Sequence, residues 1–221
     1  MSKIRMNKTI IFLGMPRSGT TLISEYFSMH KDFAWITNYH EKFKGLFLLN
    51  LLVPLSINRY WNISGQKKQY QNVGFLNKIK VTPTEAYDFW EYQVGDKINF
   101  SLDAVLSDLD EKQIHRIRRN LSFLRKMQFK KHLAFKFTEP TRLSLLTKIF
   151  PEAEIIYVER DYLDCISSLL NVNFWRNADL VKPWWNISLK EVDNRTYKSY
   201  NFIEKTAFNF FFHPEPQSCG S

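Results

Sequence analysis

The 221-residue sequence contains few cysteines and few glycines, and it has no long apolar run. Its two cysteines, Cys165 and Cys219, are too few for a disulfide framework, which favours a reducing compartment. The longest apolar stretch, residues 45–57, is shorter than the roughly 20 residues of a membrane-spanning helix. We expect a buried helix there, or alternatively a flap that faces substrate or a membrane. Because the N-terminal segment lacks the pattern of a signal peptide, we expect a cytoplasmic protein.

The charge of the chain is strongly positive, and patterns of metal ligands are missing. Lysine and arginine number 31 against 22 aspartates and glutamates, which gives a net charge of +9. Such a field attracts nucleic acids, anionic membranes and small anionic ligands alike, so charge alone does not select a partner. The five histidines are scattered without ligand-like spacing, and neither cysteine belongs to a C-x-x-C pair. We therefore predict no metal site.

Short apolar runs alternate along the chain with segments of helical periodicity. This order predicts an α/β fold, a three-layer α/β/α arrangement around a central parallel sheet that helices cover on both faces. Because repeats, low-complexity tracts and flexible linkers are missing, we expect residues 1–221 to form a single domain. Sheets of this kind bind ligands at the carboxyl ends of their strands. The expected strands are residues 9–13, 33–36, 132–137 and 154–159, and the expected helices are residues 21–30, 84–92, 109–127, 141–150 and 162–171.

A loop at the end of the first expected strand has the form of a phosphate-binding loop. It reads Gly14-Met-Pro-Arg-Ser-Gly19-Thr20-Thr21, with four residues between two glycines and hydroxyls that open a helix. The backbone N–H groups of such a loop converge on an anion, assisted by the positive end of the helix dipole. A loop for ATP or GTP carries a lysine after the second glycine, whereas this chain has Thr20 there and places Arg17 inside the loop. The loop therefore suits a phosphate, but not metal-assisted transfer from a nucleoside triphosphate.

The loop and a second segment together resemble a known family. The sequence PRSGTT after a buried strand resembles the 5′-phosphosulfate loop of sulfotransferases that use 3′-phosphoadenosine 5′-phosphosulfate (PAPS). Residues 150–169, FPEAEIIYVERDYLDCISSL, resemble the strand, loop and helix with which that family binds the 3′-phosphate. The resemblance assigns this role to Arg160, at the end of the strand, and to Ser168, with Ser167 as the adjacent alternative. Arginine suits the role because its planar fork binds phosphate oxygens in bidentate fashion.

The resemblance covers roughly residues 8–50 and 132–172. The stretch between these two segments does not align, and in this family it would be the variable acceptor-binding region. Family members carry later glycine- and lysine-containing contacts to the nucleotide, and residues 175–221 show no clear counterpart of them. The chain from about residue 176 onward is therefore poorly matched to the family.

The resemblance also implies how the loop binds PAPS, with 3′-phosphoadenosine 5′-phosphate (PAP) as the product and without a metal. Ser18, Gly19, Thr20 and Thr21 would hold the 5′-phosphate through backbone and hydroxyl donors. Arg17 stands where the family commonly has a lysine, and it would neutralise charge that grows on the bridging oxygen as the S–O bond breaks. It would act as a donor and not as an acid, because the pKa of arginine stays above about 12.

A base for the acceptor hydroxyl is expected in the segment NYHEKF, residues 38–43. This segment resembles the acidic segment of the family in which a glutamate is the catalytic base. Glu41 is therefore the first candidate and His40 the second, although the two residues could instead begin a solvated helix. A general base near the acceptor contributes about 10²–10⁴-fold in rate. Lys136, in the segment AFKFTEP, could help to balance negative charge.

The activity that the resemblance implies is transfer of the sulfuryl group of PAPS to a hydroxyl, or to an amine, of a small molecule, glycan or lipid. We rank carbohydrate and lipid hydroxyls above phenols, and we expect no nucleic-acid partner and no transmembrane segment. Two alternatives stay open, a kinase-like enzyme with a degenerate loop and a non-catalytic basic module that binds anions or nucleic acid. Basic residues in the range 112–131 could line a channel for an anionic glycan. We favour a solvated face, because these residues flank Ile114, Ile117 and Leu121 at helical spacing.

Overall fold

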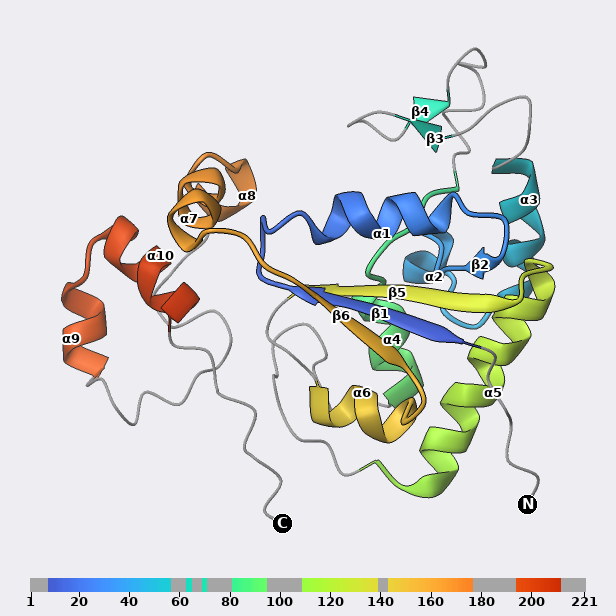
Figure 1. Ribbon diagram of the computed structural model, residues 1–221. Helices are drawn as coiled ribbons and strands as arrows, with labels where there is room; N and C mark the ends of the chain where they lie inside the picture. Colours follow the sequence, from blue (N-terminus) through green and yellow to red (C-terminus); the bar gives the residue numbers. More distant parts are fainter. Residues whose placement is uncertain are drawn as a thin grey trace.

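The computed structural model describes residues 8–56, 63–64, 69–70, 81–94, 109–138, 143–176 and 194–211. Its central sheet has four parallel strands in the spatial order β2-β5-β1-β6 (Figure 1). Gly14 pairs with Thr138 of β5 and with Val158 of β6, so three strand ends meet at one edge of the sheet. The strands of the sheet are β1 (Thr9–Gly14), β2 (Phe33–Ala34), β5 (His132–Thr138) and β6 (Glu154–Val158), and β3 (Ile63–Ser64) pairs with β4 (Gln69–Tyr70) in a separate antiparallel ribbon.

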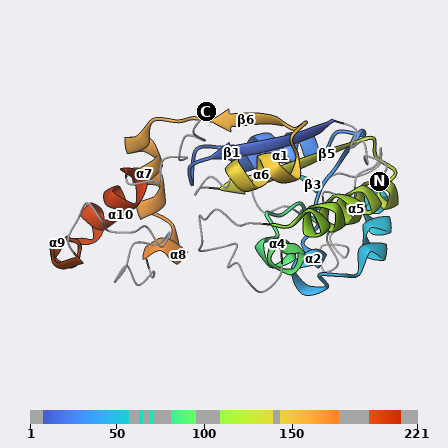
Figure 2. The ribbon, with the colours of Figure 1, turned by 90° about the horizontal axis from the view of Figure 1, so that it is seen from below.

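Helices cover both faces of the sheet, because alternate residues of β1 point to opposite sides. On one face, Phe27 of α1 (Thr20–Ser28) packs against Phe12, with 4.9 Å between the ring centroids. On the other face, Ile11 and Leu13 belong to a large core that three helices complete. These helices are α4 (Tyr87–Val94), α5 (Glu111–Met127) and α6 (Leu143–Ile149) (Figures 1 and 2). The predicted α/β/α arrangement around a parallel sheet is confirmed.

Helix α5 contains most of the basic segment singled out in the sequence. Asp110 caps the helix, because its carboxylate accepts from the N–H of Gln113 while the Gln113 side chain accepts from the N–H of Asp110. Ile117, Leu121 and Leu124 are fully buried at helical spacing. The predicted apolar stripe is therefore confirmed at these positions, whereas the basic face is solvated only in part, since the side chain of Arg118 is 17% exposed.

The C-terminal helices lie beyond the carboxyl ends of the strands (Figure 1). Met15, in the loop after β1, packs in one cluster with Cys165, Leu169 and Trp175. The indole N–H of Trp175 donates a hydrogen bond of 2.9 Å to Thr206. These contacts join the loop to the helices that follow β6. The helices are α7 (Tyr162–Leu170), α8 (Asn173–Arg176), α9 (Asn194–Ser199) and α10 (Phe202–Phe211).

The expectation of a buried helix over residues 45–57 is wrong. The segment forms a 3-10 helix, η1 (Phe47–Leu52), followed by the short helix α3 (Val53–Ser56). Leu46, Leu48 and Leu51 are between 44% and 60% exposed, whereas Asn50 is buried. The Asn50 amide donates to the carbonyl of Phe47 at 2.8 Å, so a polar side chain takes the inner position of this turn.

The second strand is also shorter than expected, since β2 ends at Ala34. The backbone N–H of Trp35 donates to the Gln128 side chain at 3.1 Å, and the Gln128 amide donates to the carbonyl of Trp35 at 2.6 Å. A side chain at the end of α5 thus takes the place of a neighbouring strand. The other predicted elements differ from the observed ones by a few residues at their ends, where helix and strand boundaries are least well defined.

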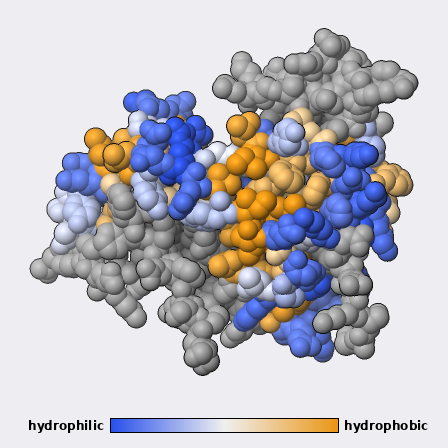
Figure 3. All heavy atoms as spheres, in the orientation of Figure 1, coloured by the Kyte–Doolittle hydropathy of each residue, from blue (hydrophilic) through white to orange (hydrophobic). Residues whose placement is uncertain are grey.

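Some apolar side chains stay at the surface of the molecule. Leu22 of α1 is 75% exposed, and Ile155 and Tyr157 of the edge strand β6 are 37% and 46% exposed. Figure 3 shows apolar residues gathered at the centre of the face viewed in Figure 1. Within the described ranges, no helix has both the length and the apolar composition to cross a bilayer.

Candidate active site

The loop between β1 and α1 turns through two residues with positive φ. The φ angle is 71° at Arg17 and 101° at Gly19. Glycine adopts such angles without a steric cost, whereas a residue with a Cβ loses about 1–2 kcal/mol. The N–H of Ser18 donates to the carbonyl of Met15 at 3.1 Å and closes the turn. A non-glycine residue held in this region is a common feature of ligand-binding loops.

Gly14 allows the loop to lie close against β6. A Cβ at this position would lie 2.6 Å from the carbonyl oxygen of Val158 and 2.7 Å from a methyl carbon of Thr20. The neighbouring Ser18 is buried, and its Oγ has no hydrogen-bond partner among the described residues. A buried hydroxyl without a partner is costly, so a ligand that accepts its hydrogen bond gains affinity. The unused hydroxyl lies in the loop for which the sequence predicts a bound phosphate.

Arg17 connects the loop to the segment that follows β6. Its Nε donates to Ser168 Oγ on α7 at 2.9 Å, across 151 positions of sequence. Arg160 lies two residues after Val158, the last residue of β6, and its Nη1 lies 3.5 Å from the carbonyl oxygen of Arg17. The structure thus brings the loop, Arg160 and Ser168 together at the carboxyl ends of β1 and β6. Ser167, the alternative to Ser168, has an exposed side chain.

Arg160 has one carboxylate beside it in this arrangement. The Asp164 carboxylate, one turn into α7, lies 3.2 Å from Arg160 Nη2, and the two side chains are 46% and 61% exposed. An ion pair this exposed contributes little stability, because water screens it. Asp161 caps α7 by accepting from the N–H of Asp164 at 3.1 Å. The Arg160 guanidinium therefore lies near the loop, and breaking its pair with Asp164 costs little.

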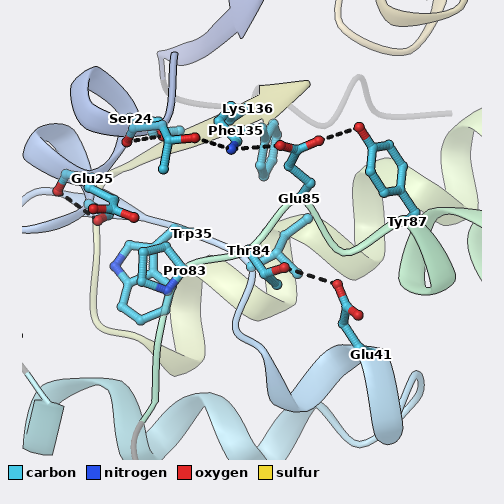
Figure 4. Close-up of a pocket in the computed structure, with 14 residues that line it drawn as sticks. Ser24, Glu25, Trp35, Glu41, Pro83, Thr84, Glu85, Tyr87, Phe135 and Lys136 are labelled. Atoms are coloured by element: carbon cyan, nitrogen blue, oxygen red, sulfur yellow. Dashed lines mark hydrogen bonds and ion pairs between the residues drawn. The ribbon is translucent and has the colours of Figure 1, made fainter. Parts of the chain in front are cut away.

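A second charged group lies beside the first turn of α1 (Figure 4). Lys136 Nζ on β5 donates to Thr21 Oγ1 at 2.7 Å and lies 2.6 Å from Glu85 Oε1. Glu85 also accepts from the hydroxyls of Thr138, at 2.6 Å, and Tyr87. The side chains of Lys136 and Glu85 are 14% and 18% exposed. This network links β5, the loop end of α1 and the segment before α4.

The protonation of Glu85 follows from its partners. Burial by itself would raise the pKa of Glu85, but the Lys136 ammonium and the hydrogen bonds from Lys136, Thr138 and Tyr87 outweigh burial and lower it. Glu85 is therefore ionised near neutral pH, and both of its oxygens accept hydrogen bonds. A carboxylate held in this way is a weak proton acceptor.

Glu85, Lys136 and Tyr87 line a cavity of about 320 Å³. The volume is near the lower end of the roughly 300–1,000 Å³ that small-molecule sites occupy. Glu41, on the short helix α2 (Tyr39–Lys42), lines the same cavity as Thr21 and Lys136. Glu41 Oε1 accepts a hydrogen bond of 2.9 Å from Thr84 Oγ1. A carboxylate thus shares a cavity with the last residue of the loop.

His40 lies in the core and is not among the residues that line the cavity. It is 1% exposed, with Nδ1 2.8 Å from Thr37 Oγ1 and Nε2 3.2 Å from Asn50 Nδ2. Because an amide nitrogen donates, Nε2 is the acceptor and Nδ1 carries the proton. Burial lowers the pKa of His40 to about 4, and the backbone hydrogen bond of Thr37 acts in the opposite direction. The imidazole is therefore neutral at physiological pH.

Several cavity residues were not predicted from the sequence as site residues. Glu85, in the segment VTPTEAY, has the pattern of a helix start, and Glu25 lies within the amphipathic helix α1. Lys136 was one signal in the sequence that a carboxylate lies nearby, because a lysine inside an apolar strand needs a carboxylate partner. In the described part of the chain, no group of three or more histidine, cysteine, aspartate or glutamate residues is placed to hold a metal ion.

Comparisons with known proteins give the family to which the chain is similar. A family model described as the sulfotransferase family matches residues 9–209, and so continues past residue 176. Among curated proteins, none matches the chain. One similar solved structure is the crystal structure of sulfotransferase STF9 from Mycobacterium avium, with 19% sequence identity and a TM-score of 0.44. The match covers 78% of this chain and 47% of the other, so this chain spans about half the length of that protein.

Proposed function

Because the chain belongs to the sulfotransferase family, we propose that it transfers the sulfuryl group of PAPS to an acceptor hydroxyl, with carbohydrate and lipid acceptors ranked above phenols. The observation that carries this proposal is the meeting of Arg17, Arg160 and Ser168 at the carboxyl ends of β1 and β6. Two guanidinium groups and a hydroxyl suit a nucleotide that bears phosphate on its ribose as well as at its 5′ end.

The two ends of the nucleotide would bind on one continuous surface. The N-terminus of α1, the Ser18 hydroxyl and the hydroxyls of Thr20 and Thr21 would hold the 5′-phosphosulfate. Arg160 and Ser168 would hold the 3′-phosphate, with Arg160 turning from Asp164 to phosphate oxygens. The buried unpartnered hydroxyl of Ser18 supports this fit, because a phosphate oxygen would accept its hydrogen bond.

The reaction would be an in-line displacement at sulfur, in which the enzyme mainly positions groups and stabilises charge. The acceptor oxygen forms a bond to sulfur as the bond from sulfur to the bridging oxygen breaks, and PAP leaves with that electron pair. Glu41 would take the proton of the acceptor hydroxyl. Arg17 would stabilise the charge that grows on the bridging oxygen, and Lys136, bound to Thr21, would add positive charge nearby.

His40 would act on the reaction through the position of Glu41. Its ring bonds Thr37 and Asn50, which precede and follow α2, and so fixes the short helix that carries the carboxylate. The neutral, buried imidazole has no route to an acceptor in the cavity. We therefore propose Glu41 as the base and His40 as a positioning residue.

Transfer of labelled sulfate from PAPS to a panel of sugars, lipids and phenols tests the proposal. We expect Glu41→Gln to retain PAP affinity within about twofold and to lower turnover by about 10²-fold or more. The control Glu111→Gln removes the same charge from the exposed start of α5 and should change neither quantity. Wild-type turnover in Glu41→Gln would reassign the base. A wild-type chain that neither binds PAP nor transfers sulfate to any acceptor would overturn the function.

A further inference from the structure

The 3-10 helix η1 presents a row of leucines to solvent. Such a helix has about three residues per turn, so residues three apart lie above one another. Phe47 and Asn50 form the inner row, since Asn50 is buried and its amide bonds the carbonyl of Phe47 at 2.8 Å. Leu48 and Leu51 form the next row, and they are 60% and 44% exposed. The folded chain thus leaves two neighbouring leucine side chains largely in water.

Further apolar side chains border this row. The N–H of Leu46 donates to the carbonyl of Phe43 at 3.0 Å, and the two residues are 46% and 50% exposed. Phe123 of α5 is 43% exposed, and its ring centroid lies 6.0 Å from that of Phe47. Single exposed leucines are ordinary, whereas apolar side chains gathered at one place indicate an interaction surface. We call this set the apolar patch, which consists of Phe43, Leu46, Leu48, Leu51 and Phe123.

Positive charge surrounds the apolar patch, on the side of the molecule away from α9 and α10, where α2 and α5 lie (Figures 1 and 2). Within the described ranges, no ion pair involves the four cations beside the patch. Residues 112–131 contain eight lysines and arginines and no aspartate or glutamate. The surface is therefore complementary to an anionic partner. The four cations are Lys42 and Lys44, on either side of Phe43 in the sequence, and Arg119 and Lys126, each about one helical turn from Phe123 on α5.

The C-terminal end of α5 adds an exposed aromatic ring at the same corner of the molecule. The Gln128 amide donates to Asn50 Oδ1 at 2.8 Å, so this end of the helix lies against η1. Phe129 follows, with a φ angle of 56° and an exposed fraction of 77%. A bulky residue at a positive φ is strained, and a ring left in water gains no burial in return. Such a side chain suits a contact with a partner outside the chain.

The mixture of apolar and basic side chains favours a lipid bilayer over other partners. A nucleic acid would bind the cations through its phosphates but would leave the leucines without apolar contacts. A second copy of the chain would bring like charges together, because a two-fold interface pairs a patch with itself. The surface of an anionic bilayer accepts both kinds of group, since apolar side chains enter at the boundary of the acyl chains while lysine and arginine bind the headgroups.

We infer that the apolar patch and the four cations beside it bind the surface of an anionic membrane as a peripheral contact. Leu48 and Leu51 enter the headgroup region, and the cations bind the phosphate and carboxylate groups of the lipids. Glu41 directly precedes Lys42, so this contact places α2, the helix that carries the proposed base, beside the bilayer. The inference goes beyond the sulfotransferase function proposed above and does not depend on it.

Sedimentation of the full chain with phosphatidylcholine vesicles, with and without about 30% phosphatidylserine, tests the inference. We expect the wild type to bind the vesicles that contain phosphatidylserine at least about tenfold more tightly than the others. The double variant Leu48→Gln/Leu51→Gln, and separately Arg119→Gln/Lys126→Gln, should each weaken this binding by at least about fivefold. Circular dichroism checks that each variant is folded.

Matched controls change the same kinds of side chain on the C-terminal helices. Leu163 and Ile203 are 73% and 60% exposed, and Arg176 and Lys198 are exposed cations of α8 and α9. The double variants Leu163→Gln/Ile203→Gln and Arg176→Gln/Lys198→Gln should therefore bind the vesicles within about twofold of the wild type.

Each other outcome overturns the inference. It is wrong if the wild type binds neither kind of vesicle or binds both equally, or if the controls lose as much affinity as the patch variants. A loss confined to the variant without Arg119 and Lys126 would indicate a soluble polyanion, such as a nucleic acid, in place of a membrane. A dimer of the wild type that dissociates in the leucine variant, measured by analytical ultracentrifugation, would show that a second copy of the chain covers the patch.

Discussion

The buried imidazole of His40 should make the stability of the fold depend on pH. The folded chain holds His40 neutral, with a pKa lowered to about 4, whereas in the unfolded chain the pKa returns to 6.5. Between these two values the unfolded state binds more protons than the folded state. Acid therefore favours unfolding, and the contribution is lost as pH falls from about 6.5 towards 4.

The magnitude follows from the difference between the two pKa values. One pKa unit corresponds to about 1.4 kcal/mol, so full protonation costs about 3 kcal/mol. Titration is partial at pH 5, where the loss relative to pH 7.5 is about 2 kcal/mol. His40 is 1% exposed, so solvent screening does not reduce this value appreciably.

Urea denaturation of the wild type and of His40→Gln at about pH 7.5 and pH 5 measures the effect. Glutamine does not titrate, and the other titrating groups contribute equally to both proteins. We expect the wild type to lose about 2 kcal/mol more than His40→Gln between the two pH values. An equal loss of unfolding free energy in the two proteins would show that burial does not hold the imidazole neutral. It would also contradict the role of His40 as a positioning residue.

Two further predictions concern the loop and the charged pair beside it. Gly14→Ala should destabilise the fold by about 3 kcal/mol in urea denaturation, because its Cβ would lie 2.6 Å from the backbone oxygen of Val158, and equal stability would refute the close approach. The control Gly45→Ala meets nothing nearer than a tyrosine hydroxyl at 3.4 Å and should stay within about 0.5 kcal/mol of the wild type. Lys136→Met should cost about 2 kcal/mol, since it leaves the carboxylate of Glu85 mostly buried without its cation. Adding Glu85→Gln should recover about half of that loss, and strictly additive effects in the double variant would argue against the pair.

The sequence predicts best those features whose chemistry is local. The run from Gly14 to Thr21 joins a strand, a turn and a helix, and residues 150–169 do the same. Each motif is therefore recognisable from its own short stretch of sequence. The two segments lie side by side because the carboxyl ends of parallel strands meet at the same edge of a sheet. The length of β2 was not predictable from the sequence. The backbone N–H and carbonyl of Trp35 form hydrogen bonds with the side chain of Gln128, which lies 93 positions away in the sequence.

The cavity beside the loop was hidden for the same physical reason. Glu85 and Thr138 bond across 53 positions, and Glu25 of α1 lines the cavity together with Lys136 of β5, which the chain reaches much later. Residues 45–57 show the reverse case, an apolar composition without complete burial. Hydropathy gives the tendency of a segment to leave water, but the tertiary fold decides which of its side chains find a partner.

The central claim is that Arg160 and the loop bind opposite ends of a nucleotide with a 3′-phosphate. Calorimetric titration of PAP and of adenosine 5′-monophosphate, which differ by that phosphate, tests it in the wild type, in Arg160→Gln and in the exposed control Arg119→Gln. We expect the wild type and Arg119→Gln to bind PAP at least about tenfold more tightly than the monophosphate, and Arg160→Gln to lose most of that preference. Equal affinity of the wild type for the two nucleotides, or an unchanged preference in Arg160→Gln, would contradict the claim.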